Sequence, residues 1–508
     1  MQIFWQKYQI LFFYIFSGLF LGIGFVVSEL WFLGLVGVGF LVYLVFGKDD
    51  TESEKSKRRL HYWGGSLAFV TKAALATSVL WSVYPIAWLS DKWWWAELLM
   101  IGLYWVLAAT ALGAFGFLVV YLSLQIKQRF GIAVAASLLP VWWVVAEILG
   151  SLVFSLVFYG AGGTVNVAYS LGYVGYLLAE HHSLLLLAKV YGVYGLSVFF
   201  IYLGIGLLWL WQTAKIKITI TYSFSLLIFI IVLLVVTAKI DFTNPLSPSG
   251  QTVMIIDTKF GGTDYYSLTD YTALKAAEVE KAVDAALLLQ PDYLLLPEGA
   301  GFIANEDDLE FARRRLGFFY NESETVIIDS GTKLLPNGDK LVRGVIYDGK
   351  NKELSEVFKS YLVPQGEYLP YVFLAILKIT ASEEFLAETK KELNFIAGKE
   401  NDFLKDSHLP VILFCFGSVD PAAVWRKLQA SATPPFVAHP ISHAWFNNSK
   451  ILEHQLDQML KIQAVWNGVP IVSAGNMVDG ALYTKTGQKV LPQVLQTEKW
   501  WQIKQFTW

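Results

Sequence analysis

Cysteine and charge are both scarce in this sequence. Among 508 residues there is one cysteine, Cys415, so no disulfide can form within the chain. Charged residues make up 16% and hydrophobic residues 55%, whereas an ordinary soluble domain carries about 25% charged residues. The formal net charge of −3 leaves no basic excess that would favour a nucleic-acid partner. Composition therefore excludes a disordered chain and a chain that is soluble throughout.

Long apolar runs fill the first half of the chain. A helix of about 20 apolar residues is enough to cross a bilayer. We predict seven crossings: two within residues 8–47, then about 65–90, 94–124, 132–158, 190–211 and 218–238. We therefore expect a polytopic α-helical membrane domain over residues 1–240, followed by a turn-rich linker over 241–250.

Basic residues are divided unequally between the two sets of helix ends. One set holds ten: Lys7, Lys48, Lys55, Lys57, Arg58, Arg59, Lys127, Arg129, Lys215 and Lys217. The other set holds three: Lys92, Lys189 and Lys239. Because cytoplasmic loops are enriched in Lys and Arg, this asymmetry predicts a cytoplasmic N-terminus. Seven crossings then place everything after residue 240 on the extracytoplasmic side.

Residues 251–508 have the composition and patterning of a soluble domain. Short apolar runs predict strands, and helical spacing over 268–289 and 449–466 predicts helices. The predicted strands are Val253–Ile256, Tyr293–Leu296, Thr325–Ser330, Val342–Tyr347, Val411–Phe414, Pro470–Ser473 and Ala481–Thr484. Intermixed strands and helices favour an α/β domain in which a sheet is layered with helices.

Three ionisable residues directly follow strand-like runs: Glu298, Lys359 and Cys415. Strand ends are where open sheets present side chains to a crevice. A carboxylate, an ammonium and a thiol could serve as general base, oxyanion stabiliser and nucleophile in acyl transfer. On spacing alone, a small core cysteine, a solvated strand end and a surface lysine fit equally. A Cys–His hydrolase using His439, His443 or His454 is a further alternative.

The sequences of these segments resemble those of the membrane branch of the nitrilase, or carbon–nitrogen hydrolase, superfamily: the apolipoprotein N-acyltransferases. Segment 296–300, LPEGA, is similar to the family's PE-x-A, which carries a general-base Glu. Segment 359–370, KSYLVPQGEYLP, is similar to K-x-x-LVPFGEY-x-P. Cys415 matches the nucleophile position, and segment 441–446, ISHAWF, is similar to SNDAWF. The start of the helix around 188–197 also matches, so the resemblance extends into the membrane part.

The resemblance implies a nitrilase-like αββα sandwich over residues 251–508, on the extracytoplasmic face of a bacterial inner membrane. It implies a catalytic set of Glu298, Lys359 and Cys415, supported by Glu367, Phe416 and Trp445, with no metal or cofactor. It further implies that an acyl chain passes from a phospholipid, through a thioester on Cys415, to the N-terminal amine of diacylglyceryl-cysteine. The implied partners are therefore the phospholipid donor, diacylated lipoproteins and the lipid bilayer.

The sequence departs from the family pattern at several positions. Phe416 and Gly417 stand where the family usually has Tyr and Glu, and Ser442-His443 replace Asn-Asp. No apolar run long enough to cross a bilayer precedes Trp508, where relatives usually have an eighth helix. We therefore expect that the domain is anchored at one end only or that the tail lies at the membrane interface. Two alternatives remain open: a membrane-tethered amidase, and a decayed homologue that only binds lipid.

Overall fold

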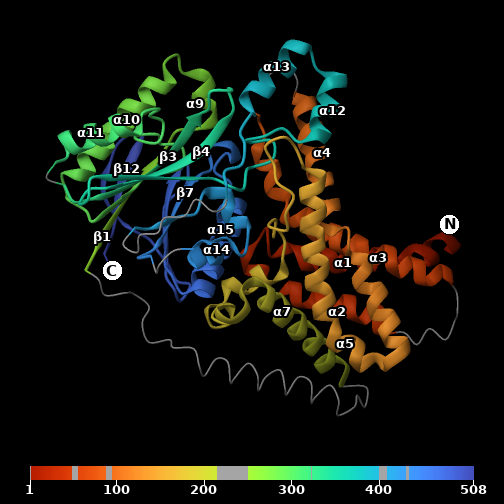
Figure 1. The fold of residues 1–508 in the computed structure, drawn as a ribbon. Coiled ribbons are helices and arrows are strands. Elements are labelled where there is room, and N and C mark those ends of the chain that lie inside the picture. The colour runs from red at the N-terminus through yellow and green to blue at the C-terminus, as the bar shows by residue number, and fades with distance from the viewer. Residues whose placement is uncertain are drawn as a thin grey trace.

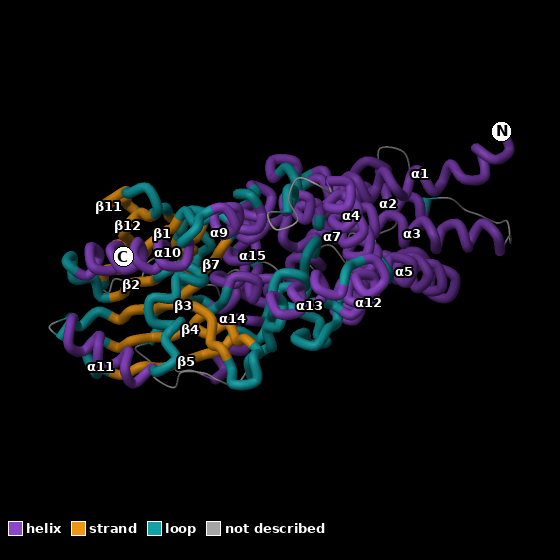
Figure 2. Tube along the Cα trace, turned by 90° about the horizontal axis from the view of Figure 1, so that it is seen from above, coloured by secondary structure: helices purple, strands orange, loops and turns teal. Residues whose placement is uncertain are grey.

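The computed structural model describes residues 2–47, 55–86, 94–213, 250–321, 323–399, 409–430 and 434–507. An all-helical part formed by the N-terminal half packs beside an α/β part formed by the C-terminal half (Figure 1). Figure 2 shows the strands gathered at one end of the molecule and the helical bundle at the other. The expected architecture, a helical membrane domain followed by an α/β domain, is confirmed.

The bundle consists of six long helices and shorter turns, among the residues described. The long helices are α1 Gln2–Ile23, α2 Leu33–Phe46, α3 Lys55–Ala76, α4 Trp94–Gly113, α5 Gly116–Val157 and α7 Ala188–Thr213. The short elements are η1 Ser28–Leu30, η2 Ser78–Val83, η3 Val174–Glu180 and α6 His182–Leu185. Four helical stretches are long and apolar enough to cross a membrane: Ser28–Phe46, Arg58–Val83, Glu97–Val157 and Ala188–Trp209. The crossing predicted over 218–238 lies outside the described residues.

Two predicted crossings have different boundaries in the structure. Helix α3 begins inside the predicted charged loop and ends at Ala76, where the Ala76 carbonyl accepts a hydrogen bond from Gln455 of the α/β part. The run predicted over 94–124 is divided between α4 and α5. Helix α5 also has a non-helical residue, Gly131, with φ 86° and ψ 169°. Apolar composition alone did not predict these helix breaks, because the residues before and after each break are equally apolar.

Close helix contact explains why the break between α4 and α5 is flanked by glycines. A Cβ atom on Gly113 would lie 2.5 Å from the Val70 backbone, and one on Gly116 would lie 2.3 Å from the Gly65 carbonyl oxygen. Both distances are shorter than van der Waals contact allows. Glycine at these positions therefore lets α3 pack directly against the α4–α5 junction, as small residues do between membrane helices.

The α/β part contains twelve strands among the described residues. They are β1 Thr252–Thr258, β2 Tyr293–Leu295, β3 Val326–Leu334, β4 Lys340–Asp348, β5 Glu353–Phe358, β6 Val411–Ile412, β7 Val437–Ser442, β8 Ile471–Asn476, β9 Leu482–Tyr483, β10 Lys489–Val490, β11 Gln493–Thr497 and β12 Trp501–Thr507. The helices are α9 Gly262–Ser267, α10 Tyr271–Leu287, α11 Leu309–Phe319, α12 Tyr371–Thr380, α13 Glu383–Glu392, α14 Ala423–Ala430 and α15 Lys450–Asn467. The short turns η4 Cys415–Val419 and η5 Ala444–Phe446 complete it.

The strands form two packed layers that meet at one point. One layer runs β11-β12-β1-β2-β3-β4-β5 and the other β6-β7-β8-β9-β10, and a single pair, Thr258 with Asn476, links β1 to β8. Val253 and Ile255 of β1 lie in the core between the layers, together with Ile412 and Ala438. Alternate side chains of each layer pack under helices, α10 and α11 on one side and α14 and α15 on the other. The domain is therefore an αββα sandwich, as expected.

The C-terminal tail is a strand and not an interfacial segment. Strand β12 pairs antiparallel with β1 along its whole length, from Thr252 with Thr507 to Thr258 with Trp501. Lys504 of β12 is buried and lies 2.8 Å from Asp257 of β1. The expectation that the tail lies at the membrane surface is wrong, because alternate side chains from Trp501 onward fill the sandwich core.

Helix α15 joins the sandwich to the bundle. Its Gln455 side chain donates hydrogen bonds to the Phe25 and Ala76 carbonyls, at the ends of α1 and α3. Leu456 and Met459 of α15 belong to the same buried apolar cluster as the bundle helices. The two parts therefore share one continuous core.

Candidate active site

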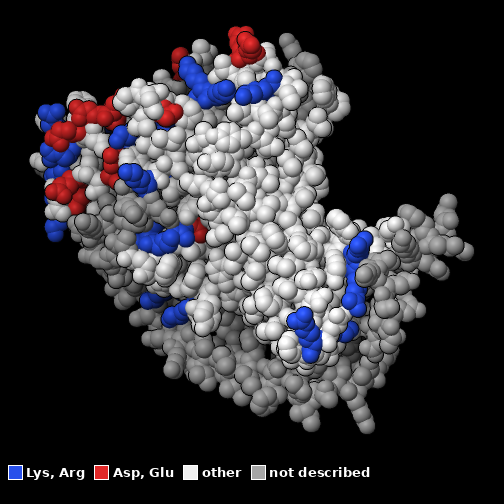
Figure 3. Space-filling model, turned by 45° about the vertical axis from the view of Figure 1, so that its right-hand side comes forward, with Lys and Arg blue, Asp and Glu red and all other residues white. Residues whose placement is uncertain are grey.

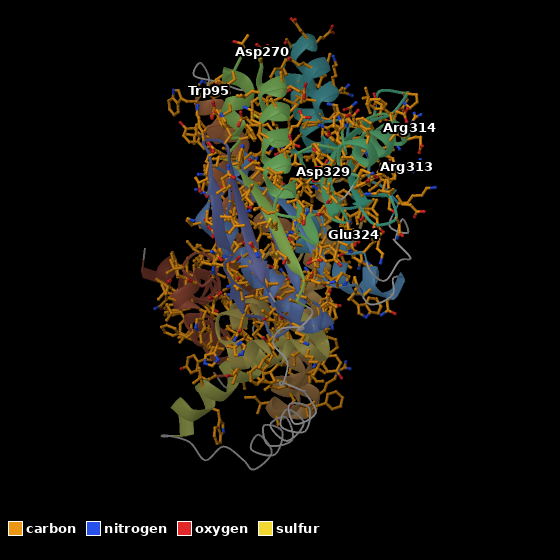
Figure 4. All side chains as sticks on the ribbon, turned by 90° about the vertical axis from the view of Figure 1, so that its left-hand side faces the viewer. Trp95, Asp270, Arg313, Arg314, Glu324 and Asp329 are labelled. Atoms are coloured by element: carbon orange, nitrogen blue, oxygen red, sulfur yellow. The ribbon has the colours of Figure 1, made fainter. Side chains whose placement is uncertain are left out.

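Glu298 lies at the carboxyl end of β2 on a loop that buried polar groups hold in place. Leu296 still donates to the Ile328 carbonyl, after which Pro297 ends the strand. Gly299 and Gly301 both have positive φ, 73° and 72°, a backbone conformation that glycine adopts without strain. The buried carboxylate of Asp329 on β3 accepts from the Ile303, Ala304 and Gly301 amides at 2.6, 2.8 and 3.2 Å. Figure 4 shows Asp329 inside the domain, whereas Arg313 and Arg314 lie at its outer surface.

Lys359 and Glu367 come from one segment that folds back on itself. Lys359 directly follows β5, and its amide donates to the Val342 carbonyl. Its buried ammonium donates to Glu298 Oε1 at 3.0 Å and to Glu367 Oε1 at 2.7 Å. The other Glu367 oxygen accepts from the Val363 amide at 2.7 Å. Two carboxylates from different loops therefore share one ammonium ion.

Cys415 begins the 3-10 turn η4 after β6. Its Sγ lies 3.9 Å from the Ser442 carbonyl at the end of β7. The Ser442 hydroxyl accepts from Asn476 Nδ2 at 3.1 Å, and Asn476 Oδ1 accepts from the Phe260 amide. Strands β2, β5 and β6 therefore bring Glu298 and Lys359 close enough for their charges to act on the Cys415 thiol.

Burial and charge set the protonation of these groups. Burial, with the negative charge of Glu298, raises the pKa of the Cys415 thiol, and the charge of Lys359 opposes this shift. Burial would lower the pKa of Lys359, but the charges of Glu298 and Glu367 outweigh burial and raise it. Burial raises the pKa of Glu367, against the charge of Lys359. The thiol therefore holds its proton at neutral pH, and chemistry at sulfur needs a base to remove it.

Bundle residues hold the turn that follows Cys415. The Phe416 and Tyr169 rings pack with centroids 5.8 Å apart. The Val419 carbonyl accepts from the Ser170 amide at 3.2 Å and also from the Ser170 hydroxyl. On the opposite side, Gln463 of α15 donates to the Ser418 carbonyl at 2.7 Å. Cys415 and Phe416 pack against the apolar cluster of the bundle, so the thiol lies where the two parts meet.

Gly417 and Trp445, two further positions singled out in the sequence, lie at the margins of this site. A small cleft borders Gly417 and Lys359 and reaches Tyr361 and Lys427. Trp445 on η5 is 47% exposed, and Asn447 beside it donates to the Ser82 and Tyr84 carbonyls of the bundle. The structure thus places Trp445 at the rim, on the turn that contacts η2.

The histidines do not pair with the thiol as a Cys–His hydrolase would require. His439 lies on strand β7, not in a loop or helix, and its Nε2 faces the Cys415 carbonyl oxygen at 3.4 Å. Burial lowers the pKa of His439 to about 3 and that of His443 to about 4, so both are neutral. His454 Nε2 lies 3.6 Å from Glu180. Among the described residues, no cluster of three or more His, Cys, Asp and Glu could hold a metal ion.

Comparison with known proteins gives one curated relative and several structural neighbours. No family model matches the chain. A protein of Rickettsia prowazekii (strain Madrid E) named apolipoprotein N-acyltransferase is 25% identical over 211 residues, covering 40% of this chain. The chain is similar to an apolipoprotein N-acyltransferase. The match spans only 39% of that relative's length. The resemblance noted in the sequence is confirmed.

The α/β half is also similar to solved structures at low identity. An amidase from Nesterenkonia sp. is 14% identical with a TM-score of 0.32, covering 53% of this chain and 94% of the other. A carbon–nitrogen hydrolase from Helicobacter pylori G27 is 10% identical with a TM-score of 0.30, covering 50% and 88%.

Sequence reasoning missed the residues that support this site. Asp329 and Ser170 carry no motif of their own, and their partners lie far away in sequence. One signal was present: Lys72 is a lone lysine inside an apolar run, and it forms an ion pair with Glu147 at 2.7 Å. An ionisable residue inside a membrane segment is a reason to look for a partner.

Proposed function

We propose that this chain is an N-acyltransferase that moves an acyl chain from a phospholipid to the N-terminal amine of diacylglyceryl-cysteine on apolipoproteins. The observation that carries the proposal is the position of Cys415 against the apolar cluster of the bundle, with Lys359 and Glu298 paired beside it. A soluble amide hydrolase has no need for its thiol to lie against membrane helices. Both substrates of the proposed reaction are lipids, so their ester and amine groups reach the protein at the bilayer surface.

The first half-reaction forms a thioester. Glu298 takes the proton of the Cys415 thiol, and the thiolate attacks the ester carbonyl of the phospholipid. Lys359 and the Phe416 amide stabilise the negative charge on the carbonyl oxygen. The carbon–oxygen bond then breaks, and the lysophospholipid leaves with the proton that Glu298 held.

The second half-reaction forms an amide. The neutral α-amine of the diacylglyceryl-cysteine attacks the thioester carbonyl, and the carbon–sulfur bond breaks. Glu298 takes the proton lost by the amine and returns it to the Cys415 sulfur. Because the two substrates react in turn through a covalent intermediate, we expect ping-pong kinetics.

The distribution of charge supports an orientation with the sandwich on the extracytoplasmic face of a bacterial inner membrane. Arg58 and Arg59 begin α3, and Lys127 donates to the Phe46 carbonyl at the end of α2. In Figure 3, basic side chains without acidic neighbours lie at the end of the bundle away from the sandwich. Over the sandwich, basic and acidic side chains are mixed. The positive-inside tendency favours the cytoplasm for that end.

Intact-mass spectrometry of the detergent-purified full chain tests this function. After incubation with phospholipid vesicles of mixed headgroup, we expect a mass gain of one acyl chain that hydroxylamine removes. Cys415→Ala is the matched control and should gain nothing. Transfer of that acyl group to a diacylated lipopeptide would complete the cycle. No adduct on the folded wild-type protein would contradict the proposal and favour the tethered amidase or the inactive lipid-binding homologue.

A further inference from the structure

A buried ion pair in the bundle lies at the centre of a hydrogen-bond network that leads to Cys415. The Lys72 and Glu147 side chains are only 5% and 2% exposed, and Lys72 Nζ lies 2.7 Å from Glu147 Oε1. Lys72 is on α3 and Glu147 on α5. Two charges inside an apolar bundle are costly unless further hydrogen bonds satisfy them. The remaining partners of Glu147 therefore indicate what the pair is for.

Trp143 of α5, Val174 and Ser197 of α7 donate to the Glu147 carboxylate. Val174 belongs to the stretch between α5 and α7, residues 158–187, called here the bridging segment. Glu147 Oε1 accepts from the Val174 amide at 3.1 Å, at the start of η3. Glu147 Oε2 accepts from Ser197 Oγ at 3.3 Å, and Ser197 Oγ itself accepts from the Gly175 amide at 3.0 Å. Two consecutive amides of the bridging segment are thus held by Glu147, one directly and one through Ser197.

The same segment holds the turn that carries the thiol. Ser170 donates from both its amide and its hydroxyl to the Val419 carbonyl, and its hydroxyl lies 2.6 Å from Tyr176 OH. Tyr169, one residue earlier, packs on Phe416. The segment therefore contacts Glu147 at residues 174–175 and the nucleophile turn at residues 169–170.

A second connection reaches the segment from the same helical turn as Glu147. Ser151 Oγ contacts the Glu147 and Tyr169 carbonyls and lies 2.8 Å from Tyr173 OH. All these groups are buried, so water cannot take over a bond that is lost. A shift of Glu147 would therefore move the backbone that packs on Phe416.

We propose that Lys72 and Glu147 are positioning residues, which hold the bridging segment against the turn of Cys415. The pair acts at a distance, through Val174 and Ser170, and touches no substrate. The expected effect of the pair on kcat rests on the acyltransferase function proposed above. The expected effect of the pair on the reactivity of the Cys415 thiol does not. Because Cys415 is the only cysteine in the chain, alkylation by N-ethylmaleimide reports on this one thiol without other substitutions.

The decisive variant is the double substitution Lys72→Met with Glu147→Leu, measured on the full chain in detergent. It removes both charges while keeping apolar bulk, a replacement that folded proteins often tolerate. We expect Cys415 alkylation to rise at least tenfold and kcat to fall at least tenfold, with KM for the phospholipid changing less than twofold. Tyr14→Phe, which removes the partly buried hydrogen bond to His61 between α1 and α3, is the matched control and should change neither rate more than twofold.

A double-mutant cycle tests whether the effect of Glu147 reaches Cys415 through the bridging segment. This test does not require the Lys72→Met, Glu147→Leu protein to fold. Ser170→Ala and Glu147→Gln should each accelerate alkylation, and their combination should exceed the larger single effect by less than twofold. Fully multiplicative effects would contradict the route through the bridging segment. A folded Lys72→Met, Glu147→Leu protein with wild-type alkylation would show that the pair serves only folding. If alkylation changes as expected but the wild type forms no thioester, the positioning role stands and the acyltransferase function fails.

Discussion

Lys359 Nζ lies 3.0 Å from Glu298 Oε1, although 61 positions separate the two residues in the chain. The same ammonium lies 2.7 Å from Glu367 Oε1. Burial and the negative charge of Glu298 raise the pKa of the Cys415 thiol, so the thiol keeps its proton at neutral pH. The proposed reaction therefore begins with transfer of the Cys415 proton to Glu298. This arrangement leads to four predictions.

Cys415→Ala should abolish thioester formation and turnover, while the protein still folds. The change deletes one sulfur atom at a partly buried position, so we expect a loss of unfolding free energy of about 1 kcal/mol. Intact mass and a thermal melt in detergent measure the two effects. Normal triacylation of a lipopeptide by this variant would show that another residue is the nucleophile.

Glu298→Gln should slow turnover yet speed the alkylation of Cys415. Loss of the general base lowers kcat by about 10²–10⁴-fold. The negative charge of Glu298 helps to raise the thiol pKa, so removing the charge increases the thiolate fraction at pH 8. Glu367→Gln is the comparison, because the charge of Glu367 acts on the Cys415 thiol more weakly than that of Glu298, so this variant should lower kcat less. If both kcat and the rate of Cys415 alkylation fell, the substitution would have disrupted the structure of the site and not only removed the base.

Lys359→Met should destabilise the folded protein and shift its pH dependence. It leaves two partly buried carboxylates facing each other without a cation, for which we expect a loss of about 3–5 kcal/mol. Protonation of one carboxylate relieves the repulsion, so this variant should regain stability, relative to wild type, as pH falls from 8 to 5. Melting temperatures across that range test the prediction, and a difference that is constant with pH would contradict it.

The Cys415 thiol should make the folded state less stable at high pH. Its pKa is raised in the folded protein, so the folded state holds this proton more tightly than the unfolded state. That contribution is fully present below the ordinary thiol pKa of about 8.5 and is lost as pH rises above it. The wild type should therefore lose more stability than Cys415→Ala between pH 8 and 10. Alkylation of the wild type should also keep accelerating beyond pH 9, and a plateau near pH 8.5 would mean that the thiol is solvated.

Sequence alone determined which chemistry was available and the class of fold. The uncharged runs predicted a helical membrane part, and alternating strands and helices predicted the α/β domain. Both hold because hydrophobic burial depends on composition and period, which are local properties. Glu298, Lys359 and Cys415 were singled out because each follows a strand-like run and lies in a segment that resembles a family motif, and their catalytic role stays a prediction.

Only the tertiary structure decided how these groups are supported. Strand β7 was missed because His439 and Pro440 break its apolar pattern, although six residues pair with β8. Strand β12 was read as an interfacial tail, since its partner β1 lies some 250 residues earlier in the chain. The bonds of Asp329 to the Glu298 loop, and of Ser170 to the Cys415 turn, join residues that no local pattern relates. Such contacts depend on which backbone N–H and C=O groups still lack a hydrogen-bond partner once the core has formed. No local stretch of sequence shows which groups these are, because their partners come from distant parts of the chain.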